Sequence, residues 1–289
     1  MEPTLEVVRA PAEMRARSIA LHREGRRIAL VPTMGYLHEG HLSLLDEARR
    51  RADVVALSIF VNPTQFGPTE DLARYPRDLD GDLEKARTRG CDLAFVPEAA
   101  AIYPPGFQTY VEVRELQRGL CGEHRPGHFV GVATVVLKLF NIVKPDVALF
   151  GEKDFQQLQV IRRMVRDLDL DVEIVGCPIV REPDGLAKSS RNSYLSPDER
   201  SRALGLFTAL AIARAAFEKG ERSTEALVSL ARAPLDAAAR QGRLTLEYLE
   251  LRDAETLAPA SGTLVRPAVL AVCARVGATR LIDNVVLAP

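Results

Sequence analysis

The sequence lacks an excess of charge of either sign. It has 38 basic and 39 acidic residues and a net charge of −1, so it offers no overall field that would gather nucleic acid or an anionic membrane. We therefore expect neither nucleic acid nor a membrane among its partners, and any anion that it binds must be small and held locally. Tryptophan is absent and asparagine is scarce. A heat-adapted source and a GC-rich genome would each explain this scarcity.

The sequence also lacks the features of secreted and membrane proteins. No apolar run reaches the roughly 18 residues of a membrane helix, and the first residues, MEPTLEVVRA, do not combine a basic segment with an apolar one. The four cysteines lie far apart without a C-x-x-C pair, which argues against a zinc ribbon and a disulfide scaffold. We expect a cytoplasmic protein with reduced thiols.

Hydrophobic periodicity predicts an α/β protein of about two domains, given 289 residues. Apolar runs of strand length alternate with helical patterns over the first three fifths of the chain, which is typical of a parallel sheet. Because these runs are almost continuously apolar, we expect a Rossmann-like sheet with helices on both faces. The predicted strands are residues 28–31, 54–61, 93–96, 147–150 and 172–180.

A polar, turn-rich stretch after residue 180 marks the predicted domain boundary. Residues 1–180 are expected to form the Rossmann-like catalytic domain, and residues 181–289 a smaller α+β domain with an antiparallel sheet. In the smaller domain Ser196 is a plausible N-cap for a helix that begins at Pro197 and stops at Gly220. A second helical segment at 224–233 and strands at 244–251 and 269–276 follow.

Four polar clusters follow predicted strands: residues 33–41, 62–66, 151–154 and 188–192. The carboxyl ends of the strands in an open parallel sheet form the ligand crevice. Clusters at the same edge of the sheet therefore predict one ligand site.

The first cluster has the composition of a phosphate-binding turn. Gly35 and Gly40 allow the backbone to approach a ligand closely, and the helix that follows presents unpaired N–H groups at its positive end. His38 and His41 are three residues apart, so both side chains could donate to one anionic group. Two other interpretations remain open, helix capping and metal binding, although the remaining histidines complete no zinc ligand set.

Residues 33–41, TMGYLHEGH, resemble the HxGH signature of the nucleotidyltransferase superfamily and, more closely, the pantothenate synthetase family. Further segments resemble the same family in order and spacing, so that the resemblance spans nearly the whole chain. They are FVNPTQFG at 60–67, YPR at 75–77, the RPGHF segment at 125–132, FGEKDFQQ at 150–157, residues 181–192 and RLIDN at 280–284.

The resemblance implies an ATP-dependent ligase of pantothenate biosynthesis. Such an enzyme condenses (R)-pantoate with β-alanine through a pantoyl adenylate and releases AMP and diphosphate. It implies ATP as a substrate, Mg²⁺ as a cofactor and a homodimer. Because the polar cluster at 188–192 lies at the predicted domain boundary, where a phosphate ligand would tie the two domains together, we also hypothesise that the second domain closes on ATP.

The resemblance assigns His38, His41 and Lys153 to catalysis. Lys153 follows a glycine at a strand end, so its ammonium could reach a phosphate, whereas a lysine in an isolated surface loop would simply be solvated. Ser189, Ser190 and Arg191 would be the counterpart of a KMSKS loop, and otherwise a polar linker. The expected ATP-binding residues are Pro32, Thr33, Met34, Gly40, Gly151, Lys153, Asp154, Val180, Lys188, Ser189, Ser190 and Arg191.

The expected pantoate and β-alanine site combines amides with an apolar wall. Gln65 and Gln157 have donors and acceptors suited to a carboxylate and hydroxyls. Most of the apolar residues would also be ordinary core. Mg²⁺ is expected mainly on the ATP phosphates, with Asp82 as a further partner, unless Asp82 is simply solvated. The expected residues for the two substrates are Gln65, Gln157, Asn62, Met34, Phe60, Val135 and Val136.

Two alternatives to the ligase are kept. A nucleotidyltransferase that leaves the nucleotide on its product would share His38 and His41, but the pair Gln65 and Gln157 and the second domain favour the ligase. A nucleotide-sensing module would bind ATP without turnover.

Overall fold

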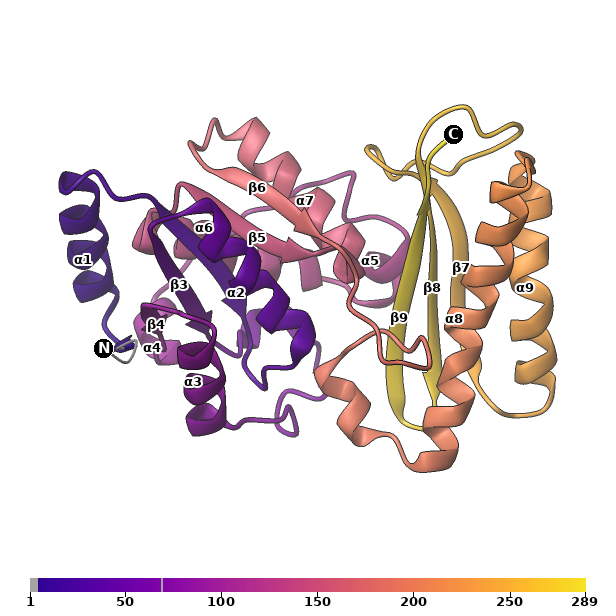
Figure 1. The fold of residues 1–289 in the computed structure, drawn as a ribbon, viewed down its shortest axis with the longest axis horizontal. Helices are drawn as coiled ribbons and strands as arrows, with labels where there is room; N and C mark the ends of the chain where they lie inside the picture. Colours follow the sequence, from indigo (N-terminus) through magenta and orange to yellow (C-terminus); the bar gives the residue numbers. More distant parts are fainter. Residues whose placement is uncertain (1–4, 69) are drawn as a thin grey trace. The chain divides into compact units, whose positions relative to one another are not determined.

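The protein forms two compact units in a computed structural model that describes residues 5–68 and 70–289 (Figure 1). The first unit comprises residues 1–117, 125–152 and 160–178. The second comprises residues 118–124, 153–159 and 179–289. Two short segments from the middle of the chain thus belong to the unit that the C-terminal part builds.

The first unit is built on a six-stranded sheet with the order β1-β4-β3-β2-β5-β6, and every pairing is parallel. The predicted parallel sheet is confirmed. The first strand, β1, was not predicted, because it is only 3 residues long and only its last residue, Val8, is buried. The strands are β1 (Glu6–Val8), β2 (Ile28–Thr33), β3 (Val54–Ile59), β4 (Leu93–Phe95), β5 (Val147–Gly151) and β6 (Glu173–Cys177).

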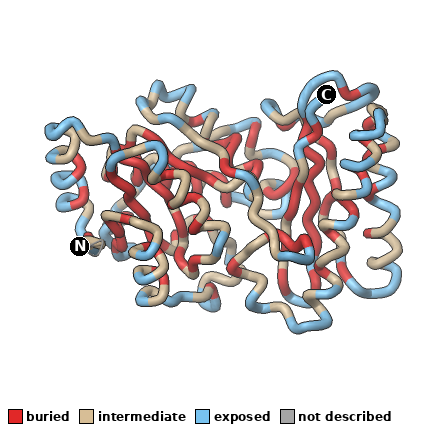
Figure 2. Tube along the Cα trace, viewed as in Figure 1, coloured by how far each residue is buried: buried red, intermediate tan, exposed pale blue. Residues whose placement is uncertain are grey.

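Helices cover both faces of this sheet. Ala29 and Val31 of β2 share a core cluster with Leu45 of α2, whereas Ile28 and Leu30 point to the opposite face and are equally buried. On that opposite face α1 and α6 pack against each other and contact β2. Burial is concentrated on the strands (Figure 2). The helices of the first half are α1 (Pro11–Arg23), α2 (Glu39–Arg51), α3 (Leu79–Thr88), α4 (Ala99–Ile102), α5 (Leu120–His124), α6 (His128–Val143) and α7 (Phe155–Asp167), with the short 3-10 helices η1 (Pro63–Gln65) and η2 (Glu152–Asp154).

The strand order reverses between β2 and β5. The chain runs outward from β2 through β3 and β4 on one side, and then returns to place β5 and β6 on the other side. In open parallel sheets the ligand crevice lies at such a reversal, at the carboxyl ends of the strands. The topology therefore selects the turn after β2 and the end of β5 as the functional edge.

The second unit contains a three-stranded antiparallel sheet of β7 (Thr245–Asp253), β8 (Ala268–Val276) and β9 (Thr279–Leu287). Two helices, α8 (Pro197–Glu218) and α9 (Thr224–Arg240), pack on it (Figure 1). The predicted N-terminus of α8 is confirmed, because Ser196 and Glu199 form a reciprocal capping box.

Two features of the second unit departed from the sequence predictions. Helix α9 continues past Ala233 through Pro234 to Arg240, and the fully buried Leu235 anchors this extension. The burial of Leu235 thus outweighs the hydrogen bond that a proline removes. Strand β9 was not predicted. The 3-10 helix η3 (Ser190–Tyr194) precedes α8.

The described residues include no helix long and apolar enough to cross a membrane.

Gly131 of α6 provides a test of packing against η1, which lies within the polar cluster at 62–66. A Cβ at Gly131 would lie 2.4 Å from the carbonyl oxygen of Thr64. Gly131→Ala should therefore destabilise the protein by about 1–3 kcal/mol, the usual cost of overpacking, and should displace η1. Gly205 of α8 is the matched control, because its nearest neighbour would be Leu244 at 4.0 Å.

Gly205→Ala should stabilise the protein by about 0.5–1 kcal/mol through helix propensity. Urea unfolding of both variants measures the two effects. Equal free energies of unfolding for the two variants would contradict the close approach of α6 to η1.

Candidate active site

The turn after β2 is held by a buried carboxylate. Gly35 and Tyr36 have positive φ angles of 85° and 54°, and Asp82 of α3 accepts the backbone N–H groups of Tyr36 at 2.7 Å and Leu37 at 2.6 Å. Asp82 is only 1% exposed. Burial raises the pKa of Asp82, and the two N–H donors oppose that rise. Both carboxylate oxygens of Asp82 therefore organise the backbone of the turn.

His38 and His41 form the N-terminus of α2. His38 is the N-cap, and its Nδ1 accepts the N–H of Gly40 at 3.1 Å, while the Nδ1 of His41 accepts the N–H of His38 at 3.4 Å. The two rings stack with centroids 4.1 Å apart. Because each Nδ1 accepts a hydrogen bond, the proton of each neutral ring lies on Nε2.

This capping arrangement is compatible with anion binding. The sequence left open whether His38 and His41 cap a helix or bind an anion, and the structure shows the caps through Nδ1. The caps engage Nδ1 of each ring. A donor to an anion at the positive end of this helix, where an anion is favoured, would therefore be Nε2–H.

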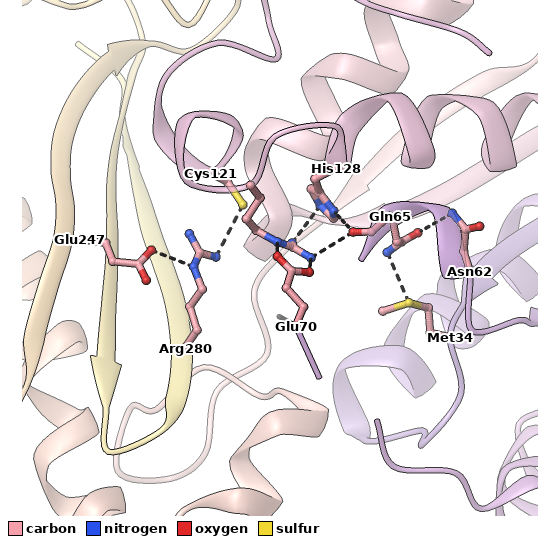
Figure 3. A network of polar contacts seen from close by, with 9 residues as sticks. Met34, Asn62, Gln65, Glu70, Cys121, His128, Glu247 and Arg280 are labelled. Carbon is pink, nitrogen blue, oxygen red and sulfur yellow. Dashed lines mark hydrogen bonds and ion pairs between the residues drawn. The ribbon is translucent and has the colours of Figure 1, made fainter. Parts of the chain in front are cut away.

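Asn62 and Gln65 lie together in the segment that follows β3 (Figure 3). Asn62 donates to the side-chain oxygen of Gln65 at 3.0 Å, and the Nε2 of Gln65 donates to the Sδ of Met34 at 3.3 Å. Both amides are buried. Met34 and Gln65 were predicted from different clusters, and the structure brings them into contact.

Arg125 and His128 hold the backbone of Gln65. The Nδ1 of His128 lies 2.8 Å from the carbonyl oxygen of Gln65, and Arg125 donates to the same oxygen at 3.3 Å. Arg125 also forms two hydrogen bonds of 2.7 Å with Glu70 (Figure 3). The sequence reasoning gave these three residues no role, although Arg125 and His128 belong to the RPGHF segment that carried part of the family resemblance.

The predicted apolar wall consists of core residues. Phe60, Val135 and Val136 are each at most 6% exposed, and the ring of Phe60 packs 6.4 Å from that of Tyr103. Pro32 and Thr33 end β2, and the hydroxyl of Thr33 donates to the carbonyl oxygen of Ser58 at 2.8 Å. These contacts make the residues structural, and a substrate-binding role for them stays a prediction.

In the second unit, Lys153 and Asp154 lie in η2 and Gln157 lies two residues into α7. The backbone carbonyl of Lys153 accepts the Nδ2 of Asn284 at 2.9 Å. Gly151, which precedes η2, is the last residue of β5. Lys153 therefore lies two residues beyond the glycine that ends the strand, and Asp154 directly precedes α7.

Residues 180–188 form a small hairpin, which is followed by η3. The N–H of Lys188 donates to the carbonyl of Val180 at 2.9 Å, and the ammonium of Lys188 pairs with Glu182 at 2.8 Å. Ser189 caps η3 by accepting the N–H of Arg191 at 3.3 Å. Lys188 thus has an anionic partner within the hairpin, which its predicted contact with ATP would have to replace.

Within residues 5–68 and 70–289, no group of three or more His, Cys, Asp or Glu side chains could hold a metal ion.

The parallel sheet, its reversal at β2 and β5 and the capped turn after β2 define a Rossmann-like α/β protein, the class to which many nucleotide-binding enzymes belong. The profile of the Pantoate-beta-alanine ligase family matches residues 6–286. The chain belongs to this family, as its sequence motifs predicted, and it is an enzyme of the ligase class.

Similar proteins cover almost the whole chain. A pantothenate synthetase from Myxococcus xanthus is 58% identical over 97% of this chain and 96% of its own length. A crystal structure of pantothenate synthetase from Thermus thermophilus matches with a TM-score of 0.92 and 48% identity, over 98% of this chain and all of that one. The pantoate-beta-alanine ligase of Francisella tularensis, complexed with beta-gamma ATP and beta-alanine, matches with a TM-score of 0.78 and 32% identity, over 98% of this chain and 97% of that one.

The ion pair of Glu70 with Arg125 predicts a pH-dependent contribution to stability. Burial would raise the pKa of Glu70, but the hydrogen bonds and charge of Arg125 outweigh it and lower the pKa below its ordinary 4.5. Such a group stabilises the fold above its unfolded-state pKa, and this stability is lost as the pH falls through the lower folded-state pKa.

Glu70→Gln should therefore cost about 1–3 kcal/mol at pH 7, less than a fully buried pair because both side chains are partly exposed. The deficit should shrink as the pH falls below 4.5. Urea unfolding across this pH range measures it. Glu84→Gln, which removes an exposed partner of Arg87, serves as the control. A Glu70→Gln deficit that does not depend on pH would contradict the role of the ion pair.

Proposed function

We propose that this chain condenses (R)-pantoate with β-alanine to give pantothenate, with ATP cleaved to AMP and diphosphate. The observation that carries the proposal is the pair of Nδ1-capped histidines at the N-terminus of α2. This anion-binding turn is in direct contact with a pair of buried amides, through Met34 and Gln65. Membership of the ligase family and the names of the relatives support the same reaction.

In the proposed first step, a carboxylate oxygen of pantoate attacks the α-phosphorus of ATP. The new P–O bond gives pantoyl adenylate, and the bond to diphosphate breaks. Negative charge builds up on the α-phosphate oxygens, so donors fixed in advance lower the barrier. The Nε2–H groups of His38 and His41 would supply two such donors, and the ammonium of Lys153 a compensating charge.

ATP is proposed to bind along the turn after β2 and the segments that carry Lys153 and Arg191. Gly40 and Gly151 allow close approach of the backbone, while Pro32, Thr33, Asp154 and Val180 complete the expected nucleotide site. Mg²⁺ is proposed to lie mainly on the phosphate oxygens, which are the hard ligands that it prefers. Asp82 would then act on the phosphates through the turn that it holds.

Pantoate is proposed to bind Gln65 and Gln157, with Asn62 fixing the amide of Gln65. The Nε2 of Gln65 donates to the Sδ of Met34, and a thioether is a weak acceptor. A carboxylate or hydroxyl of pantoate would replace it at a net gain. Phe60, Val135 and Val136 would contribute the apolar surface.

In the second step the amine of β-alanine attacks the acyl carbon of the adenylate. The C–N bond forms, the bond from that carbon to the phosphate oxygen breaks, and AMP leaves. The amine must lose its ammonium proton before the attack, and the attacking nitrogen loses a second proton after it. Binding of beta-gamma ATP and beta-alanine by the Francisella tularensis relative supports an arrangement of this kind.

Two further expectations belong to this proposal. All four cysteines are buried and form no disulfide, in keeping with a reducing compartment such as the cytoplasm. The homodimer implied by the family resemblance is tested by multi-angle light scattering, for which a mass of twice 31.7 kDa is expected.

Incubation of the protein with Mg-ATP, pantoate and β-alanine, followed by mass spectrometry, tests the reaction. We expect pantothenate and AMP. His38→Asn should keep the helix cap, because asparagine is among the best N-cap residues, yet slow adenylate formation by roughly 10²-fold through loss of the Nε2–H donor. His38→Gln, whose amide nitrogen reaches farther, should retain more activity than His38→Asn.

A product that carries the nucleotide, or the absence of turnover, would contradict the proposed reaction. A wild-type rate for His38→Asn would remove His38 from the catalytic group without affecting the reaction itself.

Lys153→Ala should slow adenylate formation by roughly 10²-fold, and Gln65→Ala should raise the KM for pantoate. Pre-steady-state release of diphosphate and steady-state kinetics measure the two effects. Lys219→Ala, at the exposed end of α8, is the matched lysine control and should leave both constants unchanged. An unaltered pantoate KM in Gln65→Ala would remove Gln65 from the substrate site.

A further inference from the structure

The segment Arg280–Asn284 of β9 carries buried polar side chains to which the proposed reaction gives no role. Asp283 and Asn284 are adjacent, and each is only 4% exposed. Successive side chains of a strand point to opposite faces of its sheet. Two adjacent residues can therefore reach two different segments of the chain, one on each face. Burial of such groups is costly unless they are hydrogen-bonded.

Asn284 holds the backbone of Lys153. Its Nδ2 donates to the carbonyl oxygen of Lys153 at 2.9 Å, and the carboxylate of Asp283 accepts the N–H of Asn284 at 2.8 Å. The side chain of Asn284 thus binds Lys153, whose ammonium the proposed reaction requires.

Arg280 lies on the same face of β9 as Asn284. It donates from Nε to Glu247 at 2.8 Å and lies 3.6 Å from the Sγ of Cys121 (Figure 3). The N–H of Cys121 donates in turn to the side-chain oxygen of Gln156 at 3.0 Å. The two short segments 118–124 and 153–159 are therefore tied to this face of the sheet and to each other.

Asp283 holds the hairpin that begins at Arg181. It accepts two hydrogen bonds from Arg181, at 2.7 and 2.9 Å. The guanidinium of Arg181 also donates to the carbonyl of Gly185 at 3.0 Å and lies 4.9 Å from the ring of Phe207 in α8. Arg181 begins the hairpin that leads into residues 188–191. Because the planar guanidinium of Arg181 is bound by both Asp283 and the carbonyl of Gly185, the first residue of the hairpin is held in place.

We propose that Asp283 and Asn284 are positioning residues for adenylate formation. Asn284 positions Lys153 by binding the backbone carbonyl of Lys153. Asp283 binds Arg181 and so positions the start of the segment that carries Ser189 and Arg191. This inference rests on the proposed function, because it assumes that both segments act on ATP.

The two positions should have different kinetic signatures. A displacement of about 1 Å at a catalytic group can cost on the order of 10²-fold in rate. Loss of the Asn284 bond frees the carbonyl of Lys153 and should lower the rate of adenylate formation. Loss of the Asp283 charge loosens the hairpin and should raise the KM for ATP instead.

Asn284→Ala is the direct test, and Asn141→Ala is its matched control. Asn141 also donates its Nδ2 to a backbone carbonyl, that of Leu137 at 3.1 Å, but on the exposed side of α6. Asn284→Leu fills the same space without a donor and keeps the test valid if the alanine variant unfolds. Thermal unfolding establishes that each variant is folded.

In Asn284→Ala the burst of diphosphate release should slow by about 10-fold or more, while the KM for pantoate and the reaction of preformed adenylate with β-alanine stay within about twofold. Asp283→Asn should raise the KM for ATP by about 10-fold with a smaller change in the burst rate. Asn141→Ala should change none of these constants.

A folded Asn284 variant with a wild-type burst rate, or one in which all three constants change in parallel, would overturn the inference, since parallel loss indicates general loosening of the fold. If the wild-type protein makes no pantothenate, the proposed function fails. If it does and the Asn284 variants match it, only the positioning role fails.

Discussion

The turn between β2 and α2 depends on one buried carboxylate. Gly35 and Tyr36 adopt left-handed conformations, which a glycine takes up freely but a tyrosine sustains only where the surroundings enforce it. Asp82 enforces them by accepting the N–H groups of Tyr36 and Leu37. This turn also brings His38 to the N-cap of α2. The placement of both imidazole rings therefore depends on Asp82, which contacts the backbone of Tyr36 and Leu37.

In both units, residues that we propose to act on substrate are held by their backbone carbonyls. His128 and Arg125 bind the carbonyl of Gln65 in the first unit, and Asn284 binds that of Lys153 in the second. A bond to the carbonyl restrains the main chain without itself engaging the side chain. Preorganisation of this kind avoids the cost of ordering a site during the reaction.

Capping and chemistry need not compete for the same histidine. An imidazole has two nitrogens, and the bond made by one decides which of them carries the proton. In His38 and His41 the caps engage Nδ1, so the structural role defines which nitrogen would donate in the proposed reaction. The fold class alone would not establish this, since many functions share a Rossmann-like sheet. It is the contact between Met34 and Gln65 that joins the turn after β2 to a pair of buried amides.

Periodicity and local chemistry in the sequence were enough to determine the parallel strands other than β1, the N-cap at Ser196 and the spacing of His38 and His41, because these depend on residues within a few positions of one another. Strand β9 and the roles of Asp82, Glu70 and Asn284 were decided only by the tertiary structure. Asp82 lies 46 residues from Tyr36 in the chain, and Asn284 lies 131 from Lys153. No local pattern marks such pairs, since a carboxylate or an amide in a helix or strand is usually solvated, and its partner is chosen only when the chain folds back upon itself.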